Sequence, residues 1–237
     1  MIPKKIHYCW FGKGEKPALA KKCLQSWRKF CPDWEIIEWN EDNFDLNCNG
    51  YVRYCYDNKK WAFLTDYIRL AVVLRHGGVY FDTDVELLKP LDSLLGYGAF
   101  YSFENADTVN TGQGFGAEAC HPTVEAMRKQ YHDLQADSSG NFSLTACPAL
   151  NTAALLPMGL IPNGKLQTVA GAVILPADYL NPYDNATGQL TVTPNTISIH
   201  HYAKSWISPL MRLRSALTRP LHRIFGKNCF SWAKKKQ

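Results

Sequence analysis

The chain has 237 residues, of which 46% are hydrophobic and 20% are charged, and this composition is typical of a globular protein with one sizeable core. No apolar run approaches the roughly 18 residues that a membrane-spanning helix needs, so we expect no transmembrane helix. The N-terminal segment has no apolar core and no cleavage pattern, so we expect no signal peptide and a cytoplasmic protein.

The net charge of +5 hides an uneven distribution along the chain. Residues 1–184 carry 17 basic and 21 acidic side chains, whereas residues 185–237 carry nine Lys or Arg and no Asp or Glu. The eight cysteines include no Cys-x-x-Cys pair. We therefore expect free thiols rather than a zinc site.

The N-terminal part of the chain predicts two strands and a helix. Residues 2–11 read as an opening strand that ends at Trp10, beside a Gly-Lys-Gly loop. Residues 17–30 predict an amphipathic helix, residues 34–39 a second strand, and residues 40–58 a polar loop with a short helix. Ligands of α/β sheets bind beyond the carboxyl ends of strands. Trp10 is therefore either a ligand-stacking residue or a core residue at a strand end.

Residues 61–86 are the most informative stretch. Apolar residues recur there at steps of three and four until Gly77-Gly78, where a helix would end in a left-handed cap. A short apolar strand follows and leads into Asp82 and Asp84. Residues two apart in an extended backbone point to the same side, so we expect both carboxylates to face one direction at the end of a buried strand.

Two carboxylates this close repel each other, and a divalent cation would remove the repulsion. Hard oxygen ligands favour Mg²⁺ or Mn²⁺, and both ions commonly share phosphate oxygens. On the preceding helix, Asp66 and Arg69 share one face. Asp82 and Asp84 could instead cap a turn, and Asp66 with Arg69 could be an ordinary ion pair, but all four in this order favour a metal and phosphate site.

This stretch resembles the sugar-binding DXD segment of glycosyltransferase family 32, which includes bacterial capsular and lipopolysaccharide sugar transferases, and that of the glucosylating clostridial toxins. The matching residues are Asp66, Arg69, Gly77, Gly78, Tyr80, Asp82 and Asp84. The resemblance implies an α/β fold of the GT-A type, with a mixed central sheet flanked by helices. It also implies a retaining transferase that needs Mn²⁺ or Mg²⁺ and a nucleotide-sugar donor, UDP-hexose in preference to GDP-mannose.

The resemblance also implies roles for single residues. Asp84 would bind the metal directly, and Asp82 would bind it through water or contact the donor, so these two are the catalytic candidates. The other donor-binding candidates are Trp10 on the nucleotide base, Tyr80 near the ribose, and Asp66 and Arg69 on donor hydroxyls and phosphate.

The second half of the chain adds further elements. It predicts a short helix within 87–95, strands at 100–103, 169–175 and 196–200, and helices at 121–134 and 146–156. The Gly-rich segment 110–117 lacks the spacing of a phosphate loop, so we expect a close backbone approach and a strand beside the substrate. Asn110 and Gln113 are candidates for contacts with sugar hydroxyls of the acceptor, with ordinary turn duty as the alternative.

A His-His-Tyr-Ala-Lys-Ser-Trp segment follows the last predicted strand and resembles the closing His-x-x-x-Ser-Trp segment of the family. In related retaining transferases a histidine there completes the metal sphere, so the resemblance implies His201 as the third metal ligand, with His200 as the alternative. Strand alternation means that only one of the two can face the metal. Ser205 and Trp206 would close over the donor as a lid.

We expect residues 1–206 to form the GT-A domain and residues 207–237 to form a basic amphipathic tail that Pro220 interrupts. Basic residues beside an apolar face suit an anionic membrane surface, which predicts peripheral attachment to the inner face of the cell membrane. A solvated helix packed on the domain is the alternative. Nucleic acid is not an expected partner, because the aromatic residues are not interleaved as stacking platforms.

The predicted function is transfer of a sugar to a glycan or a lipid-linked glycan during synthesis of a cell-surface polysaccharide, capsule or lipopolysaccharide. A catalytically silent module that binds sugar nucleotides or glycans is the alternative from another class. A nucleotidyl- or phosphotransferase is a third possibility, but the chain has no phosphate loop to support it.

Overall fold

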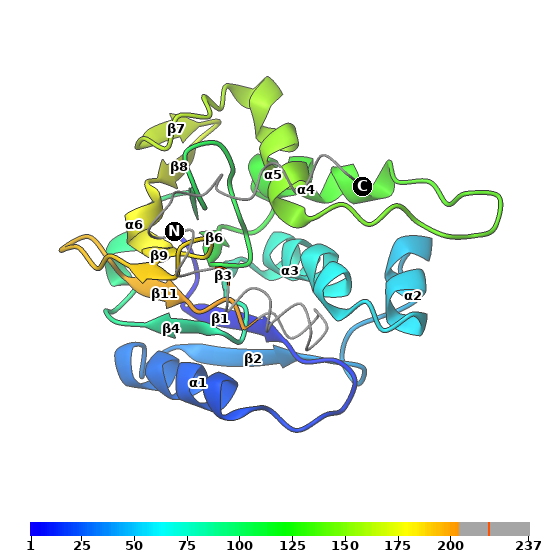
Figure 1. Cartoon of the computed structure of the whole chain (residues 1–237), viewed down its shortest axis with the longest axis horizontal. Helices are drawn as coiled ribbons and strands as arrows, with labels where there is room; N and C mark the ends of the chain where they lie inside the picture. The colour runs from blue at the N-terminus through cyan, green and yellow to red at the C-terminus, as the bar shows by residue number, and fades with distance from the viewer. Residues whose placement is uncertain (204–217, 219–237) are drawn as a thin grey trace.

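The structure is a computed structural model that describes residues 1–203 and residue 218 (Figure 1). At its centre lies a seven-stranded sheet with the strand order β2-β1-β3-β6-β5-β8-β7. The strands are β1 (Lys5–Cys9), β2 (Glu35–Trp39), β3 (Gly78–Tyr80), β5 (Ala99–Ser102), β6 (Phe115–Ala117), β7 (Gln167–Val169) and β8 (Ala172–Leu175). Two small antiparallel pairs join β4 (Val85–Leu87) to β11 (Ser198–His200) and β9 (Tyr183–Asp184) to β10 (Gln189–Leu190).

The helices are α1 (Ala18–Phe30), α2 (Gly50–Asp57), α3 (Trp61–His76), α4 (Pro122–His132), α5 (Cys147–Leu155) and α6 (Ala177–Leu180), with 3₁₀ turns η1 (Asp92–Leu94) and η2 (Leu156–Met158). No helix in this described part of the chain has the length and apolar character needed to cross a bilayer.

The sheet is mixed. Strand β1 pairs in parallel with both β2 and β3, so the carboxyl ends of these three strands point the same way. Strand β6 runs antiparallel between β3 and β5, and β8 returns parallel to β5. The expected α/β class, with a mixed central sheet flanked by helices, is confirmed.

Alternating side chains of the sheet pack into two separate hydrophobic cores. In β3, Val79 belongs to the core that includes Trp27 of α1, whereas Tyr80 belongs to the core that includes Ile68 of α3. Figure 1 shows α1 on one side of β1 and β2, with α3, α4 and α5 on the other. Asp82, which follows the end of β3, also lies on the α3 side, because it is paired with Arg69 of α3.

The end of α3 explains the Gly-Gly pair. Gly77 has a φ of 63° and Gly78 a φ of 109°, which glycine adopts without steric cost. A Cβ at Gly77 would lie 2.9 Å from Cδ of Pro3, and one at Gly78 would lie 2.9 Å from Nε2 of His7. The two glycines therefore let the chain leave α3 and enter β3 directly against β1. The helix ends at this pair as predicted, but not in a left-handed cap, because Gly77 has a ψ of -179° and so adopts an extended conformation with positive φ.

The acidic pair does not lie on a strand, and this part of the prediction is wrong. Strand β3 ends at Tyr80, and Asp82 and Asp84 lie in the turn between β3 and β4. The backbone N–H of Val85 donates to the carbonyl of Asp82 across this turn, at 3.0 Å. The carboxylates therefore converge because of a turn, not because of strand alternation. Strand β4, which holds the turn's other end, was not predicted.

Candidate active site

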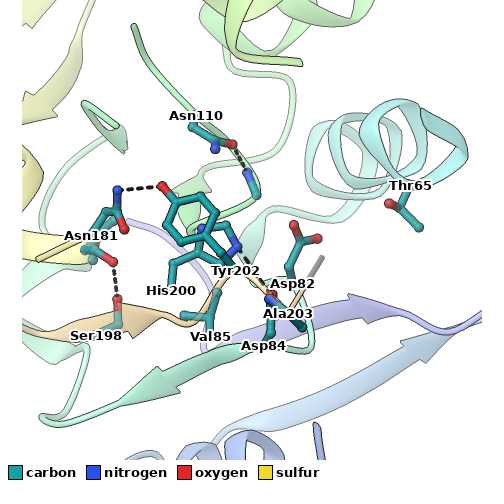
Figure 2. A network of polar contacts seen from close by, with 12 residues as sticks. Thr65, Asp82, Asp84, Val85, Asn110, Asn181, Ser198, His200, Tyr202 and Ala203 are labelled. Carbon is teal, nitrogen blue, oxygen red and sulfur yellow. Dashed lines mark hydrogen bonds and ion pairs between the residues drawn. The ribbon is translucent and has the colours of Figure 1, made fainter. Parts of the chain in front are cut away.

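Three side chains from distant segments form a candidate metal-binding group, the acidic–histidine group Asp82, Asp84 and His200. One ligand atom of each lies within 4.8 Å of the others. β11 pairs with β4, and His200 stands opposite Val85. This pairing brings the end of β11 to the acidic turn, which is the turn between β3 and β4 that carries Asp82 and Asp84. Figure 2 shows the His200 ring directed at Asp84, with Asp82 beside this pair. The sequence predicted the two carboxylates and left His200 as the alternative third ligand.

Asp84 is the most constrained member of this group. Its Oδ1 lies 3.3 Å from Nε2 of His200, and its Oδ2 accepts a 2.7 Å hydrogen bond from the backbone N–H of Ala203. Burial alone would raise the pKa of Asp84, but the neighbouring His200 outweighs this effect and lowers the pKa to about 2. Burial likewise lowers the pKa of His200, but the charge of Asp84 outweighs it and the pKa is raised on balance. The contact thus favours the charged forms of both side chains.

Arg69 is the buried cation of the site. Its Nη2 lies 2.9 Å from Oδ1 of Asp82 and 3.1 Å from Oδ1 of Asp66, and only 2% of the residue is exposed. Burial raises the pKa of Asp66 to about 6, and burial also raises the pKa of Asp82. The hydroxyl of Tyr80 donates to the same oxygen of Asp82, at 3.0 Å. The i,i+3 pair expected from the sequence is therefore part of a larger buried network, not a surface ion pair.

The donor set and the charge balance both fit a divalent cation. Two carboxylates and an imidazole are suitable ligands for Mn²⁺ or Mg²⁺. Among the described residues, Arg69 is the cation that contacts Asp66 and Asp82. With Asp66, Asp82 and Asp84 ionised and His200 neutral, these groups carry a surplus of two negative charges. The Nδ1 atom of His200 is buried and has no hydrogen-bond partner among the described residues, so the ring keeps one nitrogen uncommitted.

The backbone of the Gly-rich segment 110–117 contacts the acidic turn directly. The carbonyl of Gly112 accepts from the backbone N–H of Asp82 at 3.1 Å. A Cβ at Gly112 would lie 2.5 Å from Oδ2 of Asp82 and 2.8 Å from Nη1 of Arg69. This contact matches the close backbone approach that the sequence predicted.

Asn110 and Gln113, the two candidates for contacts with the sugar acceptor, have different surroundings. Oδ1 of Asn110 accepts from the Gly112 N–H at 2.7 Å, and the thiol of Cys147 donates to it at 3.5 Å, which places Asn110 beside Arg69 and the site. Gln113 is fully buried, and its Nε2 donates to the carbonyls of Ser102 and Phe103. Gln113 therefore stabilises the end of β5. This is a structural role, as in the alternative that the sequence indicated.

The choice of His201 over His200 is not supported by the arrangement. Nε2 of His201 lies 2.8 Å from Oε2 of Glu86, away from the acidic–histidine group, because successive residues at the end of β11 face opposite sides.

The donor-binding candidates lie in different surroundings. Trp10 is partly buried, and its Nε1 donates to the carbonyl of Gly14 at 2.6 Å. Tyr80 is 1% exposed, so its hydroxyl positions Asp82. Ser205 and Trp206 lie outside the described residues.

Sequence reasoning missed a polar network behind His200. The Tyr202 ring lies against the imidazole, with ring centroids 4.1 Å apart, and its hydroxyl donates to Oε1 of Glu104 at 3.0 Å. Nδ2 of Asn181 donates to the same hydroxyl at 2.7 Å (Figure 2). Tyr202 stands beside the two histidines in sequence and could have been noticed there. Asn181 and Glu104 carry no sequence signal, because only the fold brings them together.

Part of this chain matches a known protein family. Residues 17–101 match the family described as "Glycosyltransferase sugar-binding region containing DXD motif". Residues 17–101 are therefore similar to the sugar-binding DXD region of that glycosyltransferase family, in agreement with the resemblance seen in residues 61–86.

Two curated relatives and one solved structure are similar to the chain. An uncharacterized glycosyltransferase of Acanthamoeba polyphaga mimivirus is 31% identical over 149 residues, which are 59% of this chain and 59% of that protein. The inositol phosphoceramide mannosyltransferase 1 of Schizosaccharomyces pombe is 28% identical over 133 residues, 51% of this chain and 40% of that protein. The chain thus spans about half the length of these relatives. A solved PaToxG glycosyltransferase aligns with a TM-score of 0.49 and 17% identity over 66% of this chain and 68% of its own.

Proposed function

We propose that the chain is a metal-dependent glycosyltransferase of the GT-A type, which moves a sugar from a nucleotide-sugar donor to a glycan or lipid-linked glycan. The observation that carries the proposal is the acidic–histidine group Asp82, Asp84 and His200 beside the buried cation Arg69. Asp82, Asp84 and His200 would hold Mn²⁺ or Mg²⁺. When bound, such an ion offsets negative charge on a departing diphosphate.

The chain's own residues supply the rest. Arg69, held between Asp66 and Asp82, presents a fixed guanidinium beside the place where a donor phosphate would bind. Tyr80 holds Asp82 in place through a hydrogen bond from its hydroxyl. Gly112 leaves room for a ligand to reach both Asp82 and Arg69, because it adds no side chain there. Trp10, at the end of β1, is the proposed stacking partner for the base, and Ser205 with Trp206 the proposed lid.

The substrate class rests on the family and its members. The family's DXD region is described as sugar-binding, which supports a nucleotide-sugar donor. UDP-hexose is the favoured donor, and GDP-mannose is supported by the mannosyltransferase among the relatives. Retention of the anomeric configuration is proposed from the family resemblance. So is a role in polysaccharide, capsule or lipopolysaccharide synthesis, with residues 1–206 as the catalytic domain and residues 207–237 as a peripheral membrane attachment.

The test is release of free nucleoside diphosphate from a panel of sugar nucleotides with Mn²⁺, with Mg²⁺ and with chelator. We expect one donor to be hydrolysed with metal only, and we expect Asp84→Ala to abolish the release. Asp33→Asn changes an exposed carboxylate outside the site and serves as the control. Tight binding of a donor with no release, even with glycan acceptors present, would instead favour the silent binding module. Absence of both binding and release would refute the proposal.

A further inference from the structure

The segment between α5 and β7 exposes large apolar side chains in an otherwise well-packed domain. We call residues 156–166 the apolar loop. Leu156 is 47% exposed, Ile161 62% and Leu166 59%, and both prolines of the loop are exposed as well. Scattered single apolar residues are common on surfaces, but three within eleven residues on one connection are not.

The loop is held in the conformation that exposes these side chains. Leu160 is 4% exposed and anchors the loop in the core. The side chain of Gln167 clamps Ile161 from both sides: its Oε1 accepts from the Ile161 N–H at 2.9 Å, and its Nε2 donates to the Ile161 carbonyl at 2.8 Å. Oδ1 of Asn163 accepts from the N–H of Lys165 at 2.9 Å. Ile161 and Leu166 are therefore displayed on a braced turn.

The charge around the loop is unusual for this chain. Residues 138–177 contain no Asp or Glu, and Lys165 is the one charged side chain among them. The carboxylates of the neighbouring 104–108 segment are Glu104 and Asp107. Glu104 is engaged by Tyr202, so Asp107 is the one exposed carboxylate on that segment. The loop thus presents apolar side chains and one cation, with few groups that an anionic surface would repel.

The loop also lies near the active site. A Cβ at Gly164 would lie 3.2 Å from Cα of Ala106, so the loop packs on the 104–108 segment. Glu104 of that segment binds Tyr202, whose ring lies against His200. One neighbouring segment therefore separates the apolar loop from the acidic–histidine group.

We infer that the apolar loop is a membrane contact, which inserts Ile161 and Leu166 into the headgroup region of a lipid bilayer and turns the active-site side of the domain toward it. A bilayer fits better than a protein partner, because exposed aliphatic side chains can bury apolar surface in the bilayer while the neighbouring lysine stays at the headgroups, whereas protein hot spots favour Trp, Tyr and Arg in pockets. The contact is distinct from the basic tail and does not depend on the proposed reaction.

The test is co-sedimentation of the full chain with phosphatidylcholine vesicles, with and without phosphatidylglycerol. We expect the wild type to bind, and the double variant Ile161→Ser/Leu166→Ser to lose at least about tenfold in partition coefficient. The matched control is Leu190→Ser/Val192→Ser, which removes two side chains of similar exposure, 47% and 56%, on another part of the surface. We expect the control to bind like the wild type.

Three outcomes would overturn the inference. The wild type could fail to sediment with either vesicle, or the Ile161/Leu166 variant could sediment as well as the wild type, which would assign all binding to other residues. The wild type could also form a concentration-dependent dimer that this variant abolishes, which would make the loop a protein interface. Nucleoside diphosphate release without vesicles should be equal in all three proteins. Its absence from all of them would count against the proposed reaction and leave the vesicle result intact.

Discussion

Nε2 of His200 lies 3.3 Å from Oδ1 of Asp84, and this contact joins the end of β11 to the acidic turn after β3. The backbone N–H groups of His201 and Ala203 reinforce it, since they donate to the carbonyl and to Oδ2 of Asp84. One aspartate therefore faces the proposed metal and also holds residues 201–203 in place.

The first prediction separates the two adjacent histidines. His200→Gln should weaken Mn²⁺ binding at least about tenfold, because it removes an imidazole ligand from the acidic–histidine group. His201→Gln should leave the affinity unchanged, because that ring contacts Glu86 instead. Calorimetric titration of Mn²⁺ in the presence of a nucleoside diphosphate measures both. A loss confined to the His201 variant would restore the assignment first expected from the sequence.

The second prediction concerns the buried guanidinium. Arg69→Ala should lower the free energy of unfolding by roughly 3–5 kcal/mol, because it leaves two carboxylates, Asp66 and Asp82, without their buried partner. Urea denaturation measures this change. Arg53→Ala is the control, since Arg53 forms an exposed i,i+4 pair with Asp57 and should have little effect. Equal effects of the two substitutions would show that the Arg69 network does not hold the fold.

The third prediction tests the close backbone approach. Gly112→Ala should reduce nucleoside diphosphate release at least about tenfold, because the added methyl group would push on Asp82 and Arg69, at 2.5 and 2.8 Å. Steady-state rates with the best donor and Mn²⁺ measure the effect. Gly96→Ala is the matched control, since a Cβ there meets nothing within 4 Å. Wild-type rates in Gly112→Ala would mean that this contact yields without cost to the site.

Much of this site could be predicted from local sequence. The helix containing Asp66 and Arg69, the Gly77-Gly78 break and the acidic pair all follow from periodicity, backbone freedom and charge within one short stretch. The close approach of the Gly-rich segment was predicted as well, because glycine at that density has few other uses. These features depend on neighbours in sequence, which is why a single chain reveals them.

What the sequence did not predict depends on contacts between distant segments. The choice between His200 and His201 is decided by the register of β11 against β4, and β4 itself was not predicted. The convergence of Asp82 and Asp84 comes from a turn, although strand alternation had been expected. Gln113 proved to be a brace for β5, because its surroundings are formed by Ser102 and Phe103. The role of such a side chain depends on which distant residues pack around it.

The last prediction concerns His7, a fully buried histidine that joins three elements. Its Nδ1 accepts from the indole N–H of Trp39 at 3.1 Å, and its Nε2 lies 2.8 Å from the carbonyl of Gly77. An indole nitrogen can only donate, so Nδ1 must be unprotonated and Nε2–H donates to Gly77. Burial, chiefly, lowers the pKa of His7 from 6.5 to about 4.

The pH dependence follows from this difference in pKa. Between pH 6.5 and about 4 the unfolded chain binds a proton at His7 and the folded protein does not, so the free energy of unfolding falls as the pH falls through this window. The contribution of His7 reaches about 3 kcal/mol at the acid end. Urea denaturation of wild type and His7→Gln at several pH values should therefore show a shallower profile for the variant. His132→Gln, at an exposed histidine, controls for the loss of a histidine as such. Parallel profiles for wild type and His7→Gln would show that His7 does not cause the pH dependence.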